Sequence, residues 1–406
     1  MTTERLYHQD AYLQTFDAEV TACEPGEGGW WVTLERTCFY ATCGGQGADT
    51  GELDGQRVLD VAAQGEAVRH LVAAPIPVGR RVRGRIDWAR RFDHMQQHAG
   101  QHLISYAIWR QLDGYSLGLH IGHEDSYVDV ELPEGAPEPD LAALEDMANE
   151  LVWRDLPIRC YFPTPEEYAS MHKRKRAVID TDQIRMVDMG GVEVTPCGGT
   201  HPSSTGQIGL IKITSLLKTR GMHRFFFLCG ARAFADYRRR FEQGNRAAAL
   251  LSTQVEQLPG AVDKLLAQRR ELSAQARAQQ RRLGELAGER LAQAGSPEPW
   301  GMLYAATLPD ALDMACLREM ANRLLSTPGA VALLQAPQEG GGYGAVFARA
   351  EGLDLPIHEL FTRAVRAAGG QGGGKPAFAQ GKAPQPLDLG AAADSVRARL
   401  RPSDEK

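Results

Sequence analysis

Two short motifs that lie far apart in the sequence constrain the fold of this chain more than any other feature. The segment 195–202, TPCGGTHP, places a thiol and an imidazole four residues apart, with glycines between them. The segment 93–105, DHMQQHAGQHLIS, places His98 and His102 four apart, on one face of a predicted helix, and His94 lies one turn earlier on that face. If both motifs bind one metal ion, the fold must bring the helix and the glycine loop together.

Each motif alone indicates a metal only weakly, because a helix with two histidines and a tight turn with Cys and His are both common. Together, His98, His102, Cys197 and His201 supply three nitrogens and one sulfur, a ligand set that suits zinc. The intervening glycines would allow the backbone to fold so that Cys197 and His201 reach one point. The sequence therefore predicts one zinc ion, and leaves open a closed structural site or a catalytic site with room for water.

The chain as a whole has the composition of a globular protein. Its 406 residues predict two to four domains. The net charge of −6 means that a nucleic-acid partner would need local basic patches. Seven irregularly spaced cysteines are typical of a reducing compartment, and the sequence has neither a signal pattern nor a long apolar stretch. We expect a cytoplasmic protein with no membrane partner.

Changes in composition along the chain predict a multidomain α+β protein. Residues 1–90 consist of short, turn-punctuated strands, which favour a small antiparallel β-barrel, with a sandwich as the alternative. Residues 91–235 mix helices and strands and contain both metal motifs. Residues 236–295 have apolar side chains at helical spacing, interrupted by polar ones, which indicates a helical hairpin or imperfect coiled coil. Residues 296–406 have an α/β pattern.

Within the second domain, turn residues delimit the predicted elements. A helix over 98–114 ends at Asp-Gly, and a strand over 126–133 is stopped by proline. An amphipathic helix covers 139–155. Two strands with a turn between them, followed by a loop, are predicted over 184–201, and apolar strands are predicted over 207–218 and 223–230.

Four sequence segments carry a resemblance to a known family. The motifs HAGQH and CGGTH resemble the zinc motif of the editing domain of alanyl-tRNA synthetase and of the stand-alone, AlaX-type alanyl-tRNA editing proteins. The segment 37–53, TCFYATCGGQGADTGEL, resembles the family's glycine-rich FYxxxGGQxxDTG segment. The segment 369–381, GGQGGGKPAFAQG, is similar to a GGGxPxxAQ segment of the synthetase's C-terminal domain. The segments stand in the family's order, and the chain opens on the barrel segment with no room for an aminoacylation domain ahead of it. It therefore resembles the long form of the stand-alone editor, with the C-terminal domain retained, and we expect no aminoacylation activity.

The resemblance implies an activity and a site. It implies hydrolysis of the aminoacyl ester of mischarged tRNA(Ala), with serine as the first expectation and glycine as the second. It implies zinc at His98, His102, Cys197 and His201. The zinc could activate water or polarise the ester carbonyl, or it could position the substrate. It also implies substrate-binding residues near the aminoacyl end, namely Gly44, Gly45 and Gln46, and catalytic residues, namely Gln46, His98, His102 and Cys197.

Recognition of tRNA needs positive charge, and the sharpest basic run is HKRKR at 172–176. The predicted tRNA contacts are Lys173, Arg174, Lys175, Arg176 and, in the C-terminal segment, Lys375. A solvated loop is an equally good interpretation of the basic run. Arginines also mark the helical segment, where solubilising a coiled coil is the more common role. That segment could pair within the chain or in a homodimer, and the C-terminal domain offers a second dimer surface.

For several side chains, a purely structural or surface role stands beside a functional one. Cys43 stands where the family often has Ser or Gly, and we expect a small buried residue there. Glu193 and Asp188 could serve as bases, but surface carboxylates are equally consistent. His120 and His123 are expected in a pocket wall or loop rather than in a second metal site, and Asp129 is expected to be structural.

Other functions fit the sequence less well. The HExxH motif of common zinc peptidases is absent, and so is the DHH motif with clustered aspartates of the related phosphoesterases. A non-catalytic tRNA-binding module with a structural zinc is the remaining alternative.

Overall fold

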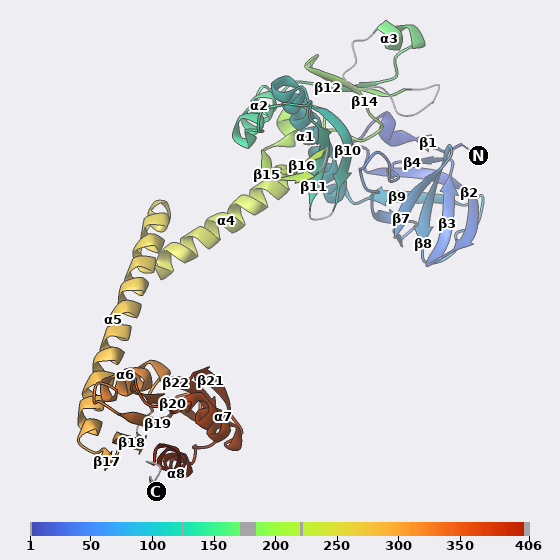
Figure 1. Ribbon diagram of the computed structural model, residues 1–406. Helices are drawn as coiled ribbons and strands as arrows, with labels where there is room; N and C mark the ends of the chain where they lie inside the picture. The colour runs from blue at the N-terminus through green and yellow to red at the C-terminus, as the bar shows by residue number, and fades with distance from the viewer. Residues whose placement is uncertain (1, 123–124, 171–183, 220–221, 310, 402–406) are drawn as a thin grey trace. The chain divides into compact units, whose positions relative to one another are not determined.

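The chain forms two compact units in a computed structural model that describes residues 2–122, 125–170, 184–219, 222–309 and 311–401. The first unit is Met1–Arg246 and the second is Ala247–Lys406. Both contain helices and sheets (Figure 1), so the predicted multidomain α+β class is confirmed. The finer division at residues 90, 235 and 295 stays a prediction.

The N-terminal part of the first unit is a seven-stranded antiparallel sheet that nearly closes into a barrel (Figure 1). Alternate residues of its strands are buried, as in the strand Arg81–Ile86, whose valine, glycine and isoleucine point inward. The two edge strands, Gln56–Val58 and Asp60–Gln64, are consecutive in the chain, and the N–H of Leu59 between them donates to the Leu71 carbonyl of the strand Ala67–Val72, at 2.8 Å. The sheet order is β6 (Gln56–Val58), β5 (Gly51–Leu53), β9 (Arg81–Ile86), β2 (Thr15–Gly26), β3 (Gly29–Leu34), β8 (Ala67–Val72) and β7 (Asp60–Gln64).

The rest of the first unit is built around the helix α1, Trp88–Leu112. It begins with an N-cap at Asp87, whose side chain accepts from the Arg90 N–H, and it ends at Asp113 in the left-handed conformation (φ 51°). The predicted end is confirmed, but the predicted start at His98 is wrong by nearly three turns. Signals for the earlier start were present, since Asp87 is an N-cap residue and Trp88, Phe92 and Met95 stand at helical spacing, although the buried polar side chains between them interrupt the apolar face.

Helix α1 packs on a four-stranded sheet and on the helix α2, and a three-stranded sheet lies beside its histidines. The predicted strand stopped by Pro133 and the predicted amphipathic helix are both confirmed. The four-stranded sheet has the order β10 (Tyr115–Ile121), β11 (Ser126–Glu131), β16 (Met222–Cys229) and β15 (Ile211–Thr219); α2 is Leu141–Trp153; the three-stranded sheet has the order β12 (Ile158–Tyr161), β13 (Met186–Met189) and β14 (Glu193–Pro196).

One predicted strand starts later than expected. The strand predicted from residue 207 begins at Ile211, because residues Thr205–Ile208 form a 3-10 turn (η2). Gly209 follows with a φ of 76°, and a strand cannot pass through that conformation. The turn is useful to the fold, since it places the Gln207 carbonyl against the Gln96 side chain of α1 (2.9 Å).

Two helices occupy the segment predicted to be helical, α4 (Gly230–Leu250) and α5 (Leu258–Ala292). That they form a coiled coil stays a prediction. Within the second unit, α5 packs against α6 (Met314–Leu324). Two glycines of α5 allow this approach, because a Cβ at Gly284 would lie 2.9 Å from the Cys316 carbonyl and one at Gly288 would lie 3.1 Å from the Arg323 side chain.

The second unit contains a six-stranded mixed sheet with helices on it, as the α/β pattern predicts. Among the described residues, no helix combines the length and apolar character needed to cross a bilayer. The sheet order is β17 (Ser296–Glu298), β18 (Gly301–Thr307), β19 (Val331–Pro337), β20 (Tyr343–Arg349), β22 (Phe378–Ala383) and β21 (Gln371–Lys375); the remaining helices are α7 (Ile357–Ala367) and α8 (Leu389–Leu400).

A buried ion pair joins α1 to the barrel-like sheet. The side chains of Arg91 and Asp49 are both 0% exposed, and the Arg91 Nε lies 3.1 Å from both carboxylate oxygens. Arg91 also donates to the Ala11 carbonyl (2.9 Å), and Asp49 accepts from the Tyr40 N–H (2.7 Å). The pair therefore fixes the segment 40–49 on the helix that carries the histidines.

We expect Arg91→Met to lower the free energy of unfolding of the first unit by about 3–5 kcal/mol, because it leaves the Asp49 carboxylate buried without its partner. The measurement is urea unfolding followed by tryptophan fluorescence. The matched control is Arg85→Met, in an exposed pair with Glu52 (66% and 53% exposed), which should cost less than about 1 kcal/mol. Equal losses in the two variants would contradict the assigned role of the buried pair.

Candidate metal centre

Helix α1 supplies two of the four predicted ligands. His98 and His102 lie on one face of α1, both buried, with stacked rings whose centroids are 5.2 Å apart. The i, i+4 spacing thus brings the two imidazoles together on one face of the helix, as the sequence predicts.

The loop after β14 supplies the other two ligands, Cys197 and His201. Arg185, which precedes β13, holds this loop by donating to the Cys197 carbonyl (3.0 Å) and the Gly199 carbonyl (2.7 Å). The Cys197 N–H in turn donates to the Arg185 carbonyl (3.0 Å). The conformation of the loop therefore depends on a nine-tenths buried guanidinium rather than on the motif alone.

The four predicted ligands converge. Their ligand atoms all lie within 4.8 Å of one another, and the Cys197 Sγ lies 3.3 Å from the Nε2 atoms of both His98 and His201. Tetrahedral zinc with bonds of about 2.3 Å to sulfur and about 2.1 Å to nitrogen separates such atoms by about 3.6 Å. Burial lowers the pKa of His201 well below its usual value, with His98, His102 and Arg185 adding to the effect. A neutral imidazole is the form that binds metal, so the donor set fits zinc.

A tight turn of the barrel-like part reaches the cluster. Cys43 and Gln46 pair through both backbone hydrogen bonds, and Gly44 and Gly45 between them have φ of 57° and 84°, as the two central residues of a type I′ turn require. Its last residue, Gln46, is fully buried, and its Oε1 lies 2.8 Å from the His98 Nδ1. The glycine pair of the predicted substrate loop thus has a conformational reason.

The same turn is anchored to its surroundings on two sides. The Gly45 carbonyl accepts from the Ile121 N–H at the end of β10 (2.8 Å), and the Ala48 carbonyl accepts from the Arg90 Nε of α1 (2.8 Å). Together with the buried pair described above, these contacts hold Gln46 in place.

Some predicted residues lie elsewhere. The predicted burial of Cys43 is wrong: its side chain is exposed, because the turn projects it outward. His94 is buried but lies outside the cluster, and burial, together with Arg90, lowers its pKa to about 4. Lys375 is exposed on the edge strand β21 of the second unit. The basic run Lys173, Arg174, Lys175 and Arg176 lies outside the described residues.

The acidic and histidine alternatives are also placed. Glu193 is buried in β14 rather than at the surface, and Asp188 accepts from the Gly191 N–H (2.6 Å). Asp129 forms a two-bonded ion pair with Arg224 (2.7 and 2.9 Å), which fits its expected structural role. Exposed His120 stacks on Tyr127 and belongs to no metal-binding group of the described residues, while His123 lies outside them.

Sequence reasoning missed three residues that shape the centre: Arg185, Asp49 and Thr200. Asp49 lies in the glycine-rich segment 37–53 and Thr200 lies in CGGTH, so their positions within these motifs indicated that they are close to the site. Arg185 had none, since a single arginine before a strand predicts nothing about burial.

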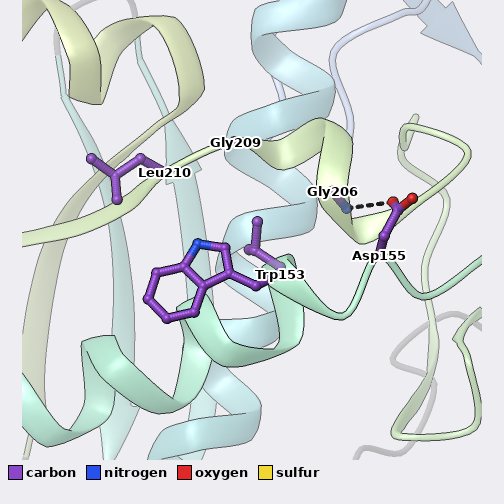
Figure 2. A pocket seen from close by; sticks show the side chains of 6 residues that line it. Trp153, Asp155, Gly206, Gly209 and Leu210 are labelled. Carbon is purple, nitrogen blue, oxygen red and sulfur yellow. Dashed lines mark hydrogen bonds between the residues drawn. The ribbon is translucent and has the colours of Figure 1, made fainter.

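A shallow pocket lies apart from the metal ligands (Figure 2). It is formed by the C-terminal end of α2 and the η2 turn, and Trp153 and Leu210 are exposed there. The Asp155 carboxylate accepts from the Gly206 N–H (3.1 Å) at its side. None of the four predicted ligands lines this pocket, so it does not belong to the metal centre.

Comparison with known proteins connects both units to one group of relatives. Residues 184–226 match the model of the threonyl and alanyl tRNA synthetase second additional domain, and residues 301–401 match the DHHA1 domain. The alanyl-tRNA editing protein AlaX-L of Pyrococcus horikoshii is 28% identical, over 93% of this chain and 94% of its own length. The alanyl-tRNA editing protein Aarsd1 of Danio rerio is 31% identical, over 63% of this chain and 66% of its own.

The same comparison includes synthetases. The alanine–tRNA ligase of Pyrobaculum calidifontis is 33% identical, over 93% of this chain and 42% of its own length. The chain thus spans about two fifths of the length of the ligases it matches. These matches confirm the predicted resemblance: the chain is a homologue of the alanyl-tRNA editing proteins and of part of the alanine–tRNA ligases.

Proposed function

We propose that this protein is a zinc-dependent deacylase that hydrolyses the aminoacyl ester of mischarged tRNA(Ala). The observation that carries the proposal is the convergence of His98, His102, Cys197 and His201 within 4.8 Å, in a chain homologous to alanyl-tRNA editing proteins. Neither the ligand cluster nor the homology alone is enough to assign the activity, because a closed metal site can be structural and homology does not fix an activity.

In this proposal the four side chains hold one zinc ion. The bound ion would supply a Lewis acid near the ester, either polarising a carbonyl or water or positioning the substrate. The protein contributes by keeping the three imidazoles buried, which restricts water around them. Gly44 and Gly45 place backbone close to the cluster, where they could contact the aminoacyl end of the substrate.

Selectivity follows from the chemistry of the substrates. A synthetase pocket for alanine cannot exclude serine or glycine strongly by size alone. A second site that binds a hydroxyl would act on Ser-tRNA(Ala) and spare Ala-tRNA(Ala), because alanine lacks that group. Serine is therefore the first proposed substrate and glycine the second.

The body of the tRNA would contact basic residues outside the centre. The proposal assigns this to Lys173, Arg174, Lys175 and Arg176 in the first unit and to Lys375 in the second. Lys375 lies on an edge strand whose residues are all exposed, so its ammonium group is accessible to phosphate.

The two glycines of the CGGTH loop offer a matched test of the geometry. A Cβ at Gly199 would lie 2.2 Å from the His98 Cε1, inside the van der Waals contact of a metal ligand. A Cβ at Gly198, one residue earlier, would have nothing within 4 Å. The cluster therefore needs glycine at position 199 and tolerates a side chain at position 198.

The first prediction concerns turnover. Purified protein should release serine or glycine from mischarged tRNA(Ala) and spare alanine, and Cys197→Ala should slow this by roughly two orders of magnitude or more, since a catalytic metal contributes several kcal/mol. The assay is deacylation of tRNA carrying each labelled amino acid, with metal content measured on the same samples. Cys23→Ala, at another partly exposed cysteine, is the control and should retain full activity.

Two outcomes would contradict the proposal. Zinc-loaded, folded protein that hydrolyses none of the three substrates but binds tRNA would support a binding module with a structural zinc. Full activity of a metal-free Cys197→Ala variant would remove the metal from the mechanism.

The second prediction concerns the loop. We expect Gly199→Ala to weaken zinc binding by about 10–100-fold, because the new methyl group displaces the His98 ring. Gly198→Ala should change it by less than about twofold. The measurement is competition for zinc with a chromophoric chelator, and similar affinities for the two variants would show that the ligands do not converge as described.

A further inference from the structure

Gln46 makes a set of hydrogen bonds that determines which ring nitrogen of His98, one of the four predicted ligands, carries the proton. Its Oε1 faces the His98 Nδ1 (2.8 Å) and the Thr200 backbone N (3.2 Å), and its Nε2 donates to the Thr200 Oγ1 (2.8 Å). The side chain is 0% exposed. An amide oxygen has two lone pairs, and both are used by protein groups.

The orientation of the amide follows from the partners. The Thr200 backbone N–H can only donate, so the atom that faces it is the oxygen of Gln46. Since an oxygen acceptor also faces the His98 Nδ1, that ring nitrogen must carry the proton. The remaining nitrogen, Nε2, is then the unprotonated one, and it faces the cluster, where the Cys197 Sγ lies 3.3 Å away.

From this arrangement we propose that Gln46 is a positioning residue of the metal centre, which acts through His98 and does not contact the aminoacyl group. This inference rests on the metal centre of the proposed function and differs from the substrate contact expected of Gln46 from resemblance. Outer partners of this kind fix the tautomer and orientation of a metal-bound histidine.

Through its contact with Thr200, Gln46 also positions the CGGTH loop, which carries the other two ligands. Thr200 lies between Cys197 and His201, so Gln46 is hydrogen-bonded to both ligand-bearing segments, α1 and the CGGTH loop. The Cβ position at Gly199 lies 3.0 Å from the Gln46 Oε1, which leaves no room for another side chain between them. Gln46 thus joins the two ligand pairs, one on α1 and the other in the CGGTH loop.

The barrel-like part of the fold is therefore a component of the metal centre. The turn that ends in Gln46 is fixed by the Gly45–Ile121 hydrogen bond and, further along, by the Asp49–Arg91 pair. A rigid turn keeps the amide oxygen within bonding distance of His98 without an entropic cost at each binding event.

The test compares two replacements of nearly equal size. Gln46→Met removes the acceptor and should weaken zinc binding by about 10–100-fold. Gln46→Glu keeps an oxygen for His98 and the Thr200 N–H, and should stay within about threefold of wild type. Zinc affinity is measured on the full chain by chelator competition, and cobalt-loaded protein reports the ligand geometry through its visible absorption.

The matched control is Gln335→Met in the second unit. Gln335 is also buried, and its amide donates to the Thr307 Oγ1 and the Leu387 carbonyl and accepts from the Leu387 N–H. This variant loses a comparable buried amide, but its zinc affinity and cobalt spectrum should equal those of wild type.

The outcomes separate this inference from the proposed function. Wild-type zinc affinity and cobalt spectrum in Gln46→Met, with a raised KM for aminoacyl-tRNA, would overturn the positioning role and leave the deacylase intact. Failure of wild type itself to bind zinc or cobalt would overturn the metal centre. If Gln46→Met does not fold, nitrogen-15 spectra of zinc-loaded wild type decide: the inference requires protonated Nδ1 and metal-bound Nε2 at His98, and the reverse contradicts it.

Discussion

The burial of polar groups on one helix is the constraint on which the first unit depends. Helix α1 buries Arg91, His98 and His102 among other polar side chains, and a buried polar group without a partner costs free energy comparable to a lost hydrogen bond or more. Neighbouring segments supply partners for three side chains of α1: Asp49 for Arg91, the Cys229 backbone for Gln97 and Gln46 for His98. Hydrogen bonds to the buried polar groups of α1 therefore hold the surrounding elements in place, together with its apolar contacts.

This constraint explains which features were predictable from the sequence. The convergence of His98, His102, Cys197 and His201 followed from donor chemistry and i, i+4 spacing, because few arrangements other than a metal site bring such residues together. The end of α1 was predictable since Asp113 and Gly114 stop a helix locally. Its start at Trp88 was signalled by the N-cap Asp87. The burial of polar residues such as Arg91 and Gln97 was not predictable, because their partners, Asp49 and the Cys229 backbone, lie far away in the sequence.

In the glycine-rich turn, too, the local conformation was predictable from the sequence but the surroundings of its residues were not. The pair Gly44-Gly45 signals a tight turn, and the two positive φ values confirm that part of the prediction. The burial of its flanking residues was not predictable: Cys43 and Gln46 pair directly across the turn, yet Cys43 is exposed, whereas Gln46, which forms a β-bridge with Ile121, is fully buried. Local chemistry thus predicts the turn, and tertiary hydrogen bonds decide what it presents.

The exposure of the four ligands bears on how chemistry could occur at the centre. His98, His102 and His201 are buried, whereas Cys197 is partly exposed and a Cβ at the adjacent Gly198 would have nothing within 4 Å. A molecule that approaches the cluster therefore reaches the Cys197 side first. On the opposite side, Gln46 and Thr200 fill the space behind His98 with a saturated hydrogen-bond network. A centre that is held by hydrogen bonds on one side and accessible on the other suits the proposed role, in which it would hold a metal ion while substrates exchange.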